Sequence, residues 1–224
     1  FYDVSAWTFP LSFNLNSEFL KENLSGNELF DKRSGKISGF SSYGYLIKPY
    51  DYNIPRFINF LQENGIRLKS SSKIFKIKNS YFDYGTLLIP VVGQSKKPEK
   101  IFELLTEISE KTGIDVYSLS SGYEDNIGFG SNSFTTIKKP KIGLIVGNGV
   151  RSYDAGEIWH LFDTRYGVPI TKLDVKNLNR TNLTEYSHII LPSYSGNSIN
   201  IDIIKDYLKR GGNIVAYRLS LIHI

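Results

Sequence analysis

The chain has 224 residues, of which 41% are hydrophobic and 14% aromatic, enough for one large domain or two small ones with a sizeable core. Lys and Arg exceed Asp and Glu by 27 to 22, and basic residues gather only in pairs such as Lys96-Lys97 and Lys138-Lys139, which excludes a nucleic-acid-binding arm. No apolar run approaches the ~18 residues of a membrane helix, so a membrane span is excluded as well.

Two residue types are missing from the sequence. The absence of cysteine excludes disulfides, thiolate metal ligands and cysteine nucleophiles from this chain. Because methionine is also absent and the chain opens on Phe1-Tyr2-Asp3, we expect it to be an internal or C-terminal piece of a longer protein. Residues 219–224 match no expected continuation of the strand before them and resemble translated sequencing adapter, so we exclude this tail from the fold.

The first part of the chain predicts short strands around two helices. Residues 1–39 have no clean hydrophobic period and are interpreted as a connector that follows an absent upstream domain and lies over the next segment. In the helix of residues 54–63, Phe57, Ile58 and Leu61 share one face, and Gly65 ends it. The full predicted order is strand 43–47, helix 54–63, strand 66–68, strand 84–90, helix 98–111 and strand 115–119.

The second part repeats this order of elements. It predicts strand 141–146, helix 153–165, strand 168–173, strand 186–192, helix 199–209 and strand 213–217. In both parts the third strand ends in an apolar pair and a proline, Pro90 or Pro192. Short apolar strands that alternate with amphipathic helices are typical of parallel sheets with helices on their faces. We therefore expect two similar α/β units, each β-α-β-β-α-β with a parallel sheet.

A polar stretch separates the two parts. Residues 121–139 are rich in Gly, Ser, Asn and Thr, and Pro140 closes them, which is typical of a domain boundary. The predicted organisation is a connector (1–39), a first α/β unit (40–139), a second α/β unit (140–218) and the tail excluded from the fold (219–224).

Two loops of the second unit are candidate binding surfaces. Gly147-Asn148-Gly149-Val150-Arg151-Ser152 joins a strand to a helix, where backbone N–H groups could cradle a phosphate, and Asp174 stands where a ribose-binding carboxylate would lie. The third glycine of that fingerprint is Ser152, however, and glycine and serine also form ordinary turns and N-caps. The structural turn is the favoured interpretation. The second loop, residues 193–197, carries Ser193 and Ser195 but lacks the Gly-x-Ser-x-Gly pattern of a serine nucleophile.

The helix of residues 153–165 carries polar side chains at regular steps, namely Asp154, Glu157, His160 and Asp163. They could suggest a metal stripe, but a solvated face of an amphipathic helix explains them better. His188 and His223 lie elsewhere in the sequence, so no metal, cofactor or catalytic residue is assigned to the chain.

On the same helix, Ile158, Leu161 and Phe162 follow the i, i+3, i+4 pattern and should face the sheet. Trp159 then lies at the edge of this stripe. We expect it to be partly exposed and to cover a seam with the other unit or with a missing domain.

Three segments resemble a group of large bacterial zinc carboxypeptidases of the carboxypeptidase A type, common in Bacteroidetes. Residues 2–10 (YDVSAWTFP) look like the segment after the catalytic domain of these enzymes. Residues 152–163 (SYDAGEIWHLFD) resemble the first helix of their C-terminal domain. Residues 186–192, together with Gly211 to Val215, resemble its later strands.

The resemblance implies that the second unit is a truncated flavodoxin-like, glutamine amidotransferase-like domain, and that the whole chain is a non-catalytic accessory region. The zinc ligands of the family, a His-x-x-Glu pair and a later His, would lie upstream, and no residue here matches them. The amidotransferase nucleophile would fall near Arg218, but it is a cysteine, which this chain lacks.

By this resemblance the parent protein would be exported to the periplasm or outside the cell and would hydrolyse C-terminal peptide bonds. The partners of this chain would be the upstream peptidase domain and, in the parent, a peptide substrate. The alternatives are a small-molecule or nucleotide-binding module that uses the loops at 147–152 and 193–197, and a purely structural spacer.

Overall fold

The computed structural model describes residue 10 and residues 13–18, 21–22, 25–26, 33–124 and 126–216. Residues 2–9 of the first resembling segment, the position of the amidotransferase nucleophile near Arg218, and the tail 219–224 with His223 lie outside these residues. The chain divides into two compact units, Phe1–Lys32 and Arg33–Ile224. The regular structure described below belongs to the second of these.

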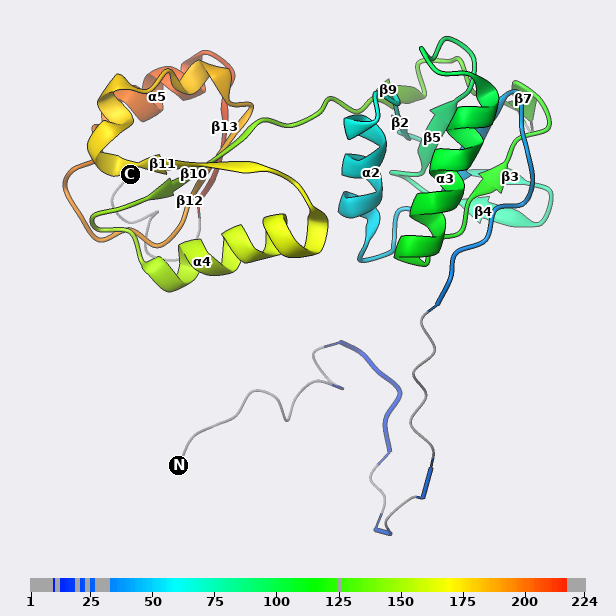
Figure 1. Cartoon of the computed structure of the whole chain (residues 1–224), viewed down its shortest axis with the longest axis horizontal. Coiled ribbons are helices and arrows are strands. Elements are labelled where there is room, and N and C mark those ends of the chain that lie inside the picture. The colour runs from blue at the N-terminus through cyan, green and yellow to red at the C-terminus, as the bar shows by residue number, and fades with distance from the viewer. Residues whose placement is uncertain are drawn as a thin grey trace. The chain divides into compact units, whose positions relative to one another are not determined.

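Residues 40–139 form a five-stranded sheet in the order β6 (Tyr117–Ser118), β1 (Gly44–Ile47), β5 (Leu87–Pro90), β2 (Lys69–Ser71) and β9 (Phe134–Thr136). Every neighbouring pair of strands in it is antiparallel. Helices α2 (Ile54–Glu63) and α3 (Pro98–Thr112) lie side by side on one face (Figure 1). This order, with β6 beside β1 and β5 between β1 and β2, is the ferredoxin-like split β-α-β arrangement.

The six elements predicted for this part occur in the predicted order, but further strands lie among them, and the predicted parallel direction of the strands is wrong. Pro90 pairs with Gly44 at the start of β1, whereas Pro192 follows a strand that runs parallel to the first strand of its own sheet. The two prolines therefore occupy unlike positions, and the repeat is one of element order only. The sequence misled because β1 and β5 are buried on both faces, and such strands are continuously apolar in either direction.

The second face of this sheet is covered by two hairpins that the sequence pattern did not indicate. They are β3 (Phe75–Ile77) with β4 (Ser80–Phe82), and β7 (Tyr123–Glu124) with β8 (Ile127–Gly128). Aromatic side chains dominate the core beneath them, whose buried members are Leu46, Phe75, Phe82, Leu88, Leu119, Ile127, Phe129 and Phe134. The segment 121–139, predicted as a boundary, thus supplies part of this core and the edge strand β9.

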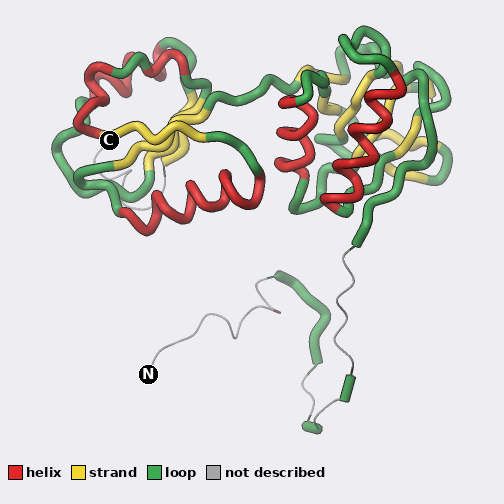
Figure 2. The backbone as a smooth tube through the Cα atoms, in the orientation of Figure 1, coloured by secondary structure: helices red, strands yellow, loops and turns green. Residues whose placement is uncertain are grey.

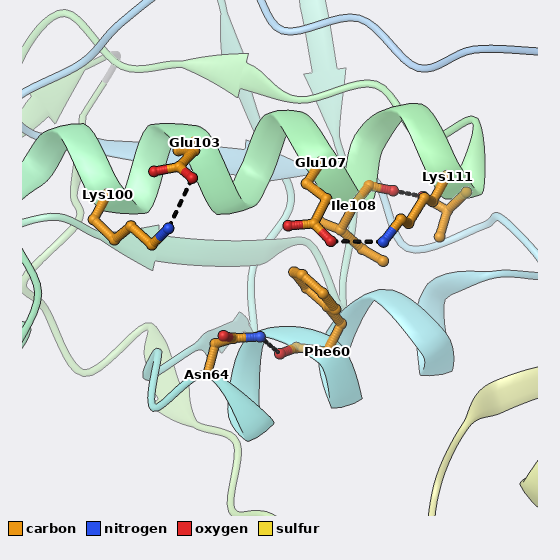
Figure 3. A network of polar contacts seen from close by, with 8 residues as sticks. Phe60, Asn64, Lys100, Glu103, Glu107, Ile108 and Lys111 are labelled. Carbon is orange, nitrogen blue, oxygen red and sulfur yellow. Dashed lines mark hydrogen bonds and ion pairs between the residues drawn. The ribbon is translucent and has the colours of Figure 1, made fainter.

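The other face packs on α2 and α3, whose extents agree closely with the prediction. Phe57 and Leu61 point into the core, while Phe60 lies under Lys111 of α3, with the ammonium nitrogen 5.8 Å from the ring centre (Figure 3). On the outer side of α3, Lys100–Glu103 and Lys111–Glu107 are exposed ion pairs at 2.8 and 2.6 Å. Exposed pairs of this kind add only ~0.5 kcal/mol each, so the apolar face holds the helices in place.

The last residues of the predicted connector are built into this sheet. The amide of Gly35 donates to the carbonyl of Ser109, and Val116 exchanges backbone hydrogen bonds with Lys36 and Ser38 at 2.8 and 3.0 Å. Residues 33–38 therefore lie along α3 and the outer edge of β6.

Residues 140–216 form a four-stranded parallel sheet, as predicted. Its order is β11 (Ile170–Asp174), β10 (Ile142–Val146), β12 (His188–Leu191) and β13 (Asn213–Ala216). Helix α4 (Ser152–His160) covers one face and α5 (Ile201–Lys209) the other (Figures 1 and 2). The helix predicted over 153–165 continues from α4 into a π-helical segment, η2 (Leu161–Tyr166), and two short 3-10 segments, η3 (Val175–Arg180) and η4 (Leu183–Glu185), precede β12.

The turn Gly211-Gly212 before β13 has a clear packing reason. Tyr207 of α5 is 2% exposed, and its hydroxyl donates to the carbonyl of Tyr186 and accepts from the amide of Asn213 at 3.1 Å. A Cβ atom on Gly212 would overlap the Tyr207 ring. Gly212 is therefore required by the close approach of this ring, and Gly211, with φ of +88°, by the backbone.

Within the described part of the chain, buried side chains form four clusters. Two of them take their members from residues 37–137, and the other two from residues 142–216. The sequence segments on the two sides of Pro140 thus build separate cores.

Candidate functional site

The two candidate loops of the second sheet lie next to each other. The loop after β10 leads to α4 on one face of the sheet, and the loop after β12 leads to α5 on the other face. Because β10 and β12 are neighbours, the two loops start side by side and then run to opposite faces. In parallel α/β sheets, ligands bind in the crevice outside the carboxyl ends of two such strands. Residues 147–152 and 193–197 are thus in the place where a ligand would be expected.

Backbone hydrogen bonds join the two loops to each other. The amide of Arg151 donates to the carbonyl of Ser193 at 2.9 Å. The amide of Ser195 donates to the carbonyl of Gly149 at 2.8 Å. Val150 and Tyr194 form an antiparallel bridge between them. Backbone amides that could cradle a phosphate are therefore partly committed within the protein.

Tyr194 occupies the crevice. It is 4% exposed, and its hydroxyl accepts hydrogen bonds from the amides of Ser198 and Ile199 at 2.7 and 3.1 Å. A Cβ atom on Gly149 would lie 2.7 Å from the Tyr194 ring, so this glycine is needed for the close approach. The glycine at position 149 is therefore explained by packing against Tyr194, in agreement with the interpretation of residues 147–152 as a structural turn.

Asp174, the candidate ribose ligand, caps a helix instead. Its carboxylate accepts a hydrogen bond from the backbone amide of Lys176 at 3.0 Å, and this bond holds the pKa of Asp174 below its ordinary value. A Cβ atom on Gly147 would lie 2.7 Å from the same carboxylate, so Gly147 gives Asp174 room to reach its cap.

The polar side chains of the α4 segment mostly form the predicted solvated face. Glu157, His160 and Asp163 are exposed, but Asp154 is 2% exposed, and for it the prediction was wrong. Asp154 lies in the first turn of α4, where a carboxylate interacts favourably with the helix dipole. Among residues 33–124 and 126–216, no group of three His, Asp or Glu side chains is arranged to hold a metal ion.

Trp159 is 40% exposed, which confirms the expected partial exposure. Its ring stacks under Lys172 of β11, whose ammonium nitrogen lies 4.9 Å from the ring centre. Ile158 and Phe162 pack against the buried residues of the sheet, as the helical pattern predicted. For Leu161 the prediction was wrong, because it lies outside this cluster and lines the hollow along the helix. The proposed seam with another domain stays a prediction.

The loop that carries Ser193 and Ser195 contains no histidine that could serve as their base. Ser193 is buried and Ser195 exposed, both beyond the carboxyl end of β12. His188 stands at the opposite end of that strand, where its Nδ1 is 3.0 Å from the hydroxyl of Ser187. His188 therefore cannot act as a base for either serine.

A cavity of about 390 Å³ lies elsewhere, on the second face of the first sheet. No motif marks it, because its lining comes from several separate segments that only the fold brings together. Arg67 and Lys69 contribute the cations of this lining.

Comparison of the chain with protein-family models, curated proteins and solved structures gives no match. Within the part of the chain that the structure describes, no helix has the length and apolar character needed to cross a membrane.

Proposed function

We propose that this chain is a non-catalytic C-terminal region of a zinc metallocarboxypeptidase-like protein that is exported and hydrolyses C-terminal peptide bonds. The zinc site belongs upstream of Phe1. In this proposal the second sheet is a truncated flavodoxin-like, glutamine amidotransferase-like domain. Its strand order, with the first strand between the second and third, and the Gly211-Gly212 turn before β13 support that assignment.

The closed crevice above β10 and β12 is the observation that carries the proposal. Tyr194 fills the position where sheets of this type bind ligands, and the two flanking loops are hydrogen-bonded to each other. A domain whose usual ligand site is filled by its own side chain is better suited to packing against a partner than to chemistry.

Helix α4 offers a surface for such packing. Tyr153 is 82% exposed, and a hollow of about 680 Å³ runs along the helix, where Glu157 and His160 line it together with Tyr52 from the loop before α2. The same helix carries the segment that resembles the peptidase family. We therefore propose that α4 contacts the upstream peptidase domain and shapes substrate access to it.

The genomic sequence upstream of Phe1 tests this proposal. A His-x-x-Glu motif, a later histidine and a signal peptide are expected there. A start codon shortly before Phe1 would contradict the proposal.

The second candidate function, a small-molecule or nucleotide-binding module, is favoured by one observation only. The loops at 147–152 and 193–197 meet beyond the carboxyl ends of β10 and β12. This function requires Tyr194 to leave its position. Isothermal titration with ADP-ribose should show no binding to the unaltered chain, and binding with a micromolar dissociation constant would favour this second function.

A further inference from the structure

The cavity on the second face of the first sheet has an apolar floor. Leu88, Leu119 and Phe129 are 1%, 4% and 8% exposed, and all three belong to the core beneath the hairpins while also lining the cavity. Val92, which is 75% exposed, lies at the mouth. A ligand with an apolar body would bury this floor.

Two cations stand over the floor. Arg67 and Lys69 flank Leu68, which is buried in the core on the helix side of the sheet, so the two cationic side chains project toward the opposite face. Among the described residues, no carboxylate lies within 4.0 Å of either cation, and the described lining includes no Asp or Glu.

Arg67 is also held in place. Its amide donates to the side-chain oxygen of Gln94 at 3.0 Å, and the Gln94 amide nitrogen donates back to the Arg67 carbonyl at 2.8 Å. The guanidinium lies against Gly93, where a Cβ atom would be 3.3 Å from Nη2. The backbone that carries this cation is therefore fixed before any ligand arrives, which lowers the entropy cost of binding.

We propose that this cavity binds a small organic carboxylate with an apolar or aromatic body. The carboxylate pairs with Arg67, whose planar guanidinium can donate two parallel hydrogen bonds, and Lys69 adds the second positive charge. The body of the ligand covers Leu88, Leu119 and Phe129. The volume of about 390 Å³ lies within the usual range for small-molecule sites, roughly 300–1,000 Å³.

Both features of the ligand are needed in this site. A neutral aromatic molecule would bury the floor but leave two cations partly desolvated without a partner. An inorganic anion would satisfy the cations and leave the floor in contact with water. The site goes beyond the proposed function, since it lies in the first sheet and involves neither α4 nor an upstream domain.

Two matched probes, N-acetylphenylalanine and N-acetylphenylalaninamide, test the site because they differ only in the carboxylate. Titration of the 15N-labelled chain, followed by amide chemical shifts, should show the acid binding at least ~10-fold more tightly than the amide. The largest shifts should fall on residues 67–69 and 119–130. Equal affinities, or shifts spread over both sheets, would overturn the proposal.

Substitutions separate the site from general charge effects. Arg67→Gln with Lys69→Gln should reduce the affinity for the acid to that for the amide. The control Lys205→Gln with Lys209→Gln removes the same charge from exposed positions on α5 and should leave the affinity unchanged.

Val92→Glu places a carboxylate at the exposed mouth and should weaken binding of the acid, whereas Val92→Gln should not. Neither of these changes should alter folding, since Val92 is exposed. An acid affinity that persists in the Arg67 and Lys69 double variant, or falls equally in the control, would refute the assignment.

Discussion

Replacement of Tyr194 by phenylalanine isolates the two hydrogen bonds that its hydroxyl accepts within the segment after β12. The ring remains against Gly149, but the amides of Ser198 and Ile199 lose their acceptor. A lost hydrogen bond typically costs ~1 kcal/mol, and a buried donor left unsatisfied costs more. Because Ser198 is exposed and Ile199 half-buried, water can reach these amides. We therefore expect a loss of about 1–2 kcal/mol in the free energy of unfolding.

In a chain of this size that loss lowers the melting temperature by roughly 2–8 °C. Thermal unfolding followed by circular dichroism measures it, and Tyr153→Phe is the matched control because its side chain is 82% exposed. Tyr194→Ala should cost more, about 3–5 kcal/mol, because it also removes a buried ring. An unchanged melting temperature in both Tyr194 variants would refute the conclusion that the buried ring and its hydroxyl stabilise this part of the fold.

Three further predictions concern packing, exposure and pH. Gly212→Ala should lower the melting temperature because the added methyl group overlaps the Tyr207 ring. The control is Gly156→Ala in helix α4, whose methyl group meets no atom within 4 Å and which should raise the melting temperature or leave it unchanged. Equal effects of the two changes would refute the packing argument. Once the other tryptophan is replaced by phenylalanine, Trp159 should show red-shifted emission that iodide or acrylamide quenches readily, and a blue-shifted, protected emission would contradict its exposure. Because the hydrogen bond from the Lys176 amide lowers the pKa of Asp174 in the folded chain, its contribution to stability should be complete above the ordinary carboxyl pKa of ~4 and lost as the pH falls through the lowered pKa. A melting-temperature difference between the unaltered chain and Asp174→Ala that stays constant as the pH falls below ~4 would contradict the capping role.

The sequence predicted helices better than sheets, for a physical reason. The stripe of Phe57 and Leu61 and the stop at Gly65 are local signals, and α2 ends within two residues of that glycine. The direction of a strand depends on which distant segments flank it, and the apolar run Leu87 to Ile89 is compatible with either sheet type. The two parts of the chain therefore share an order of predicted elements but not a sheet topology.

Among the candidate sites, too, only those marked by local sequence signals could be located from the sequence. The loop after β10 could be located because glycines between a strand and a helix mark it, yet the residue that decides its state, Tyr194, lies more than forty positions away in the sequence. The cavity with Arg67 and Lys69 could not be predicted, because its floor is completed by Phe129 from a segment that reads as a polar linker. Only the pairing of distant segments brings these residues together.

Zinc content and peptidase activity, measured on matched proteins, test the central proposal most directly. The 224-residue chain and a longer protein that includes the upstream sequence should be purified, dialysed against zinc-free buffer and assayed on a peptide with a free C-terminus. The proposal predicts about one zinc ion and release of the C-terminal residue from the longer protein, and neither from the 224-residue chain. Stoichiometric zinc in the 224-residue chain that is lost on His160→Ala, or release of the C-terminal residue by this chain alone, would contradict a non-catalytic role.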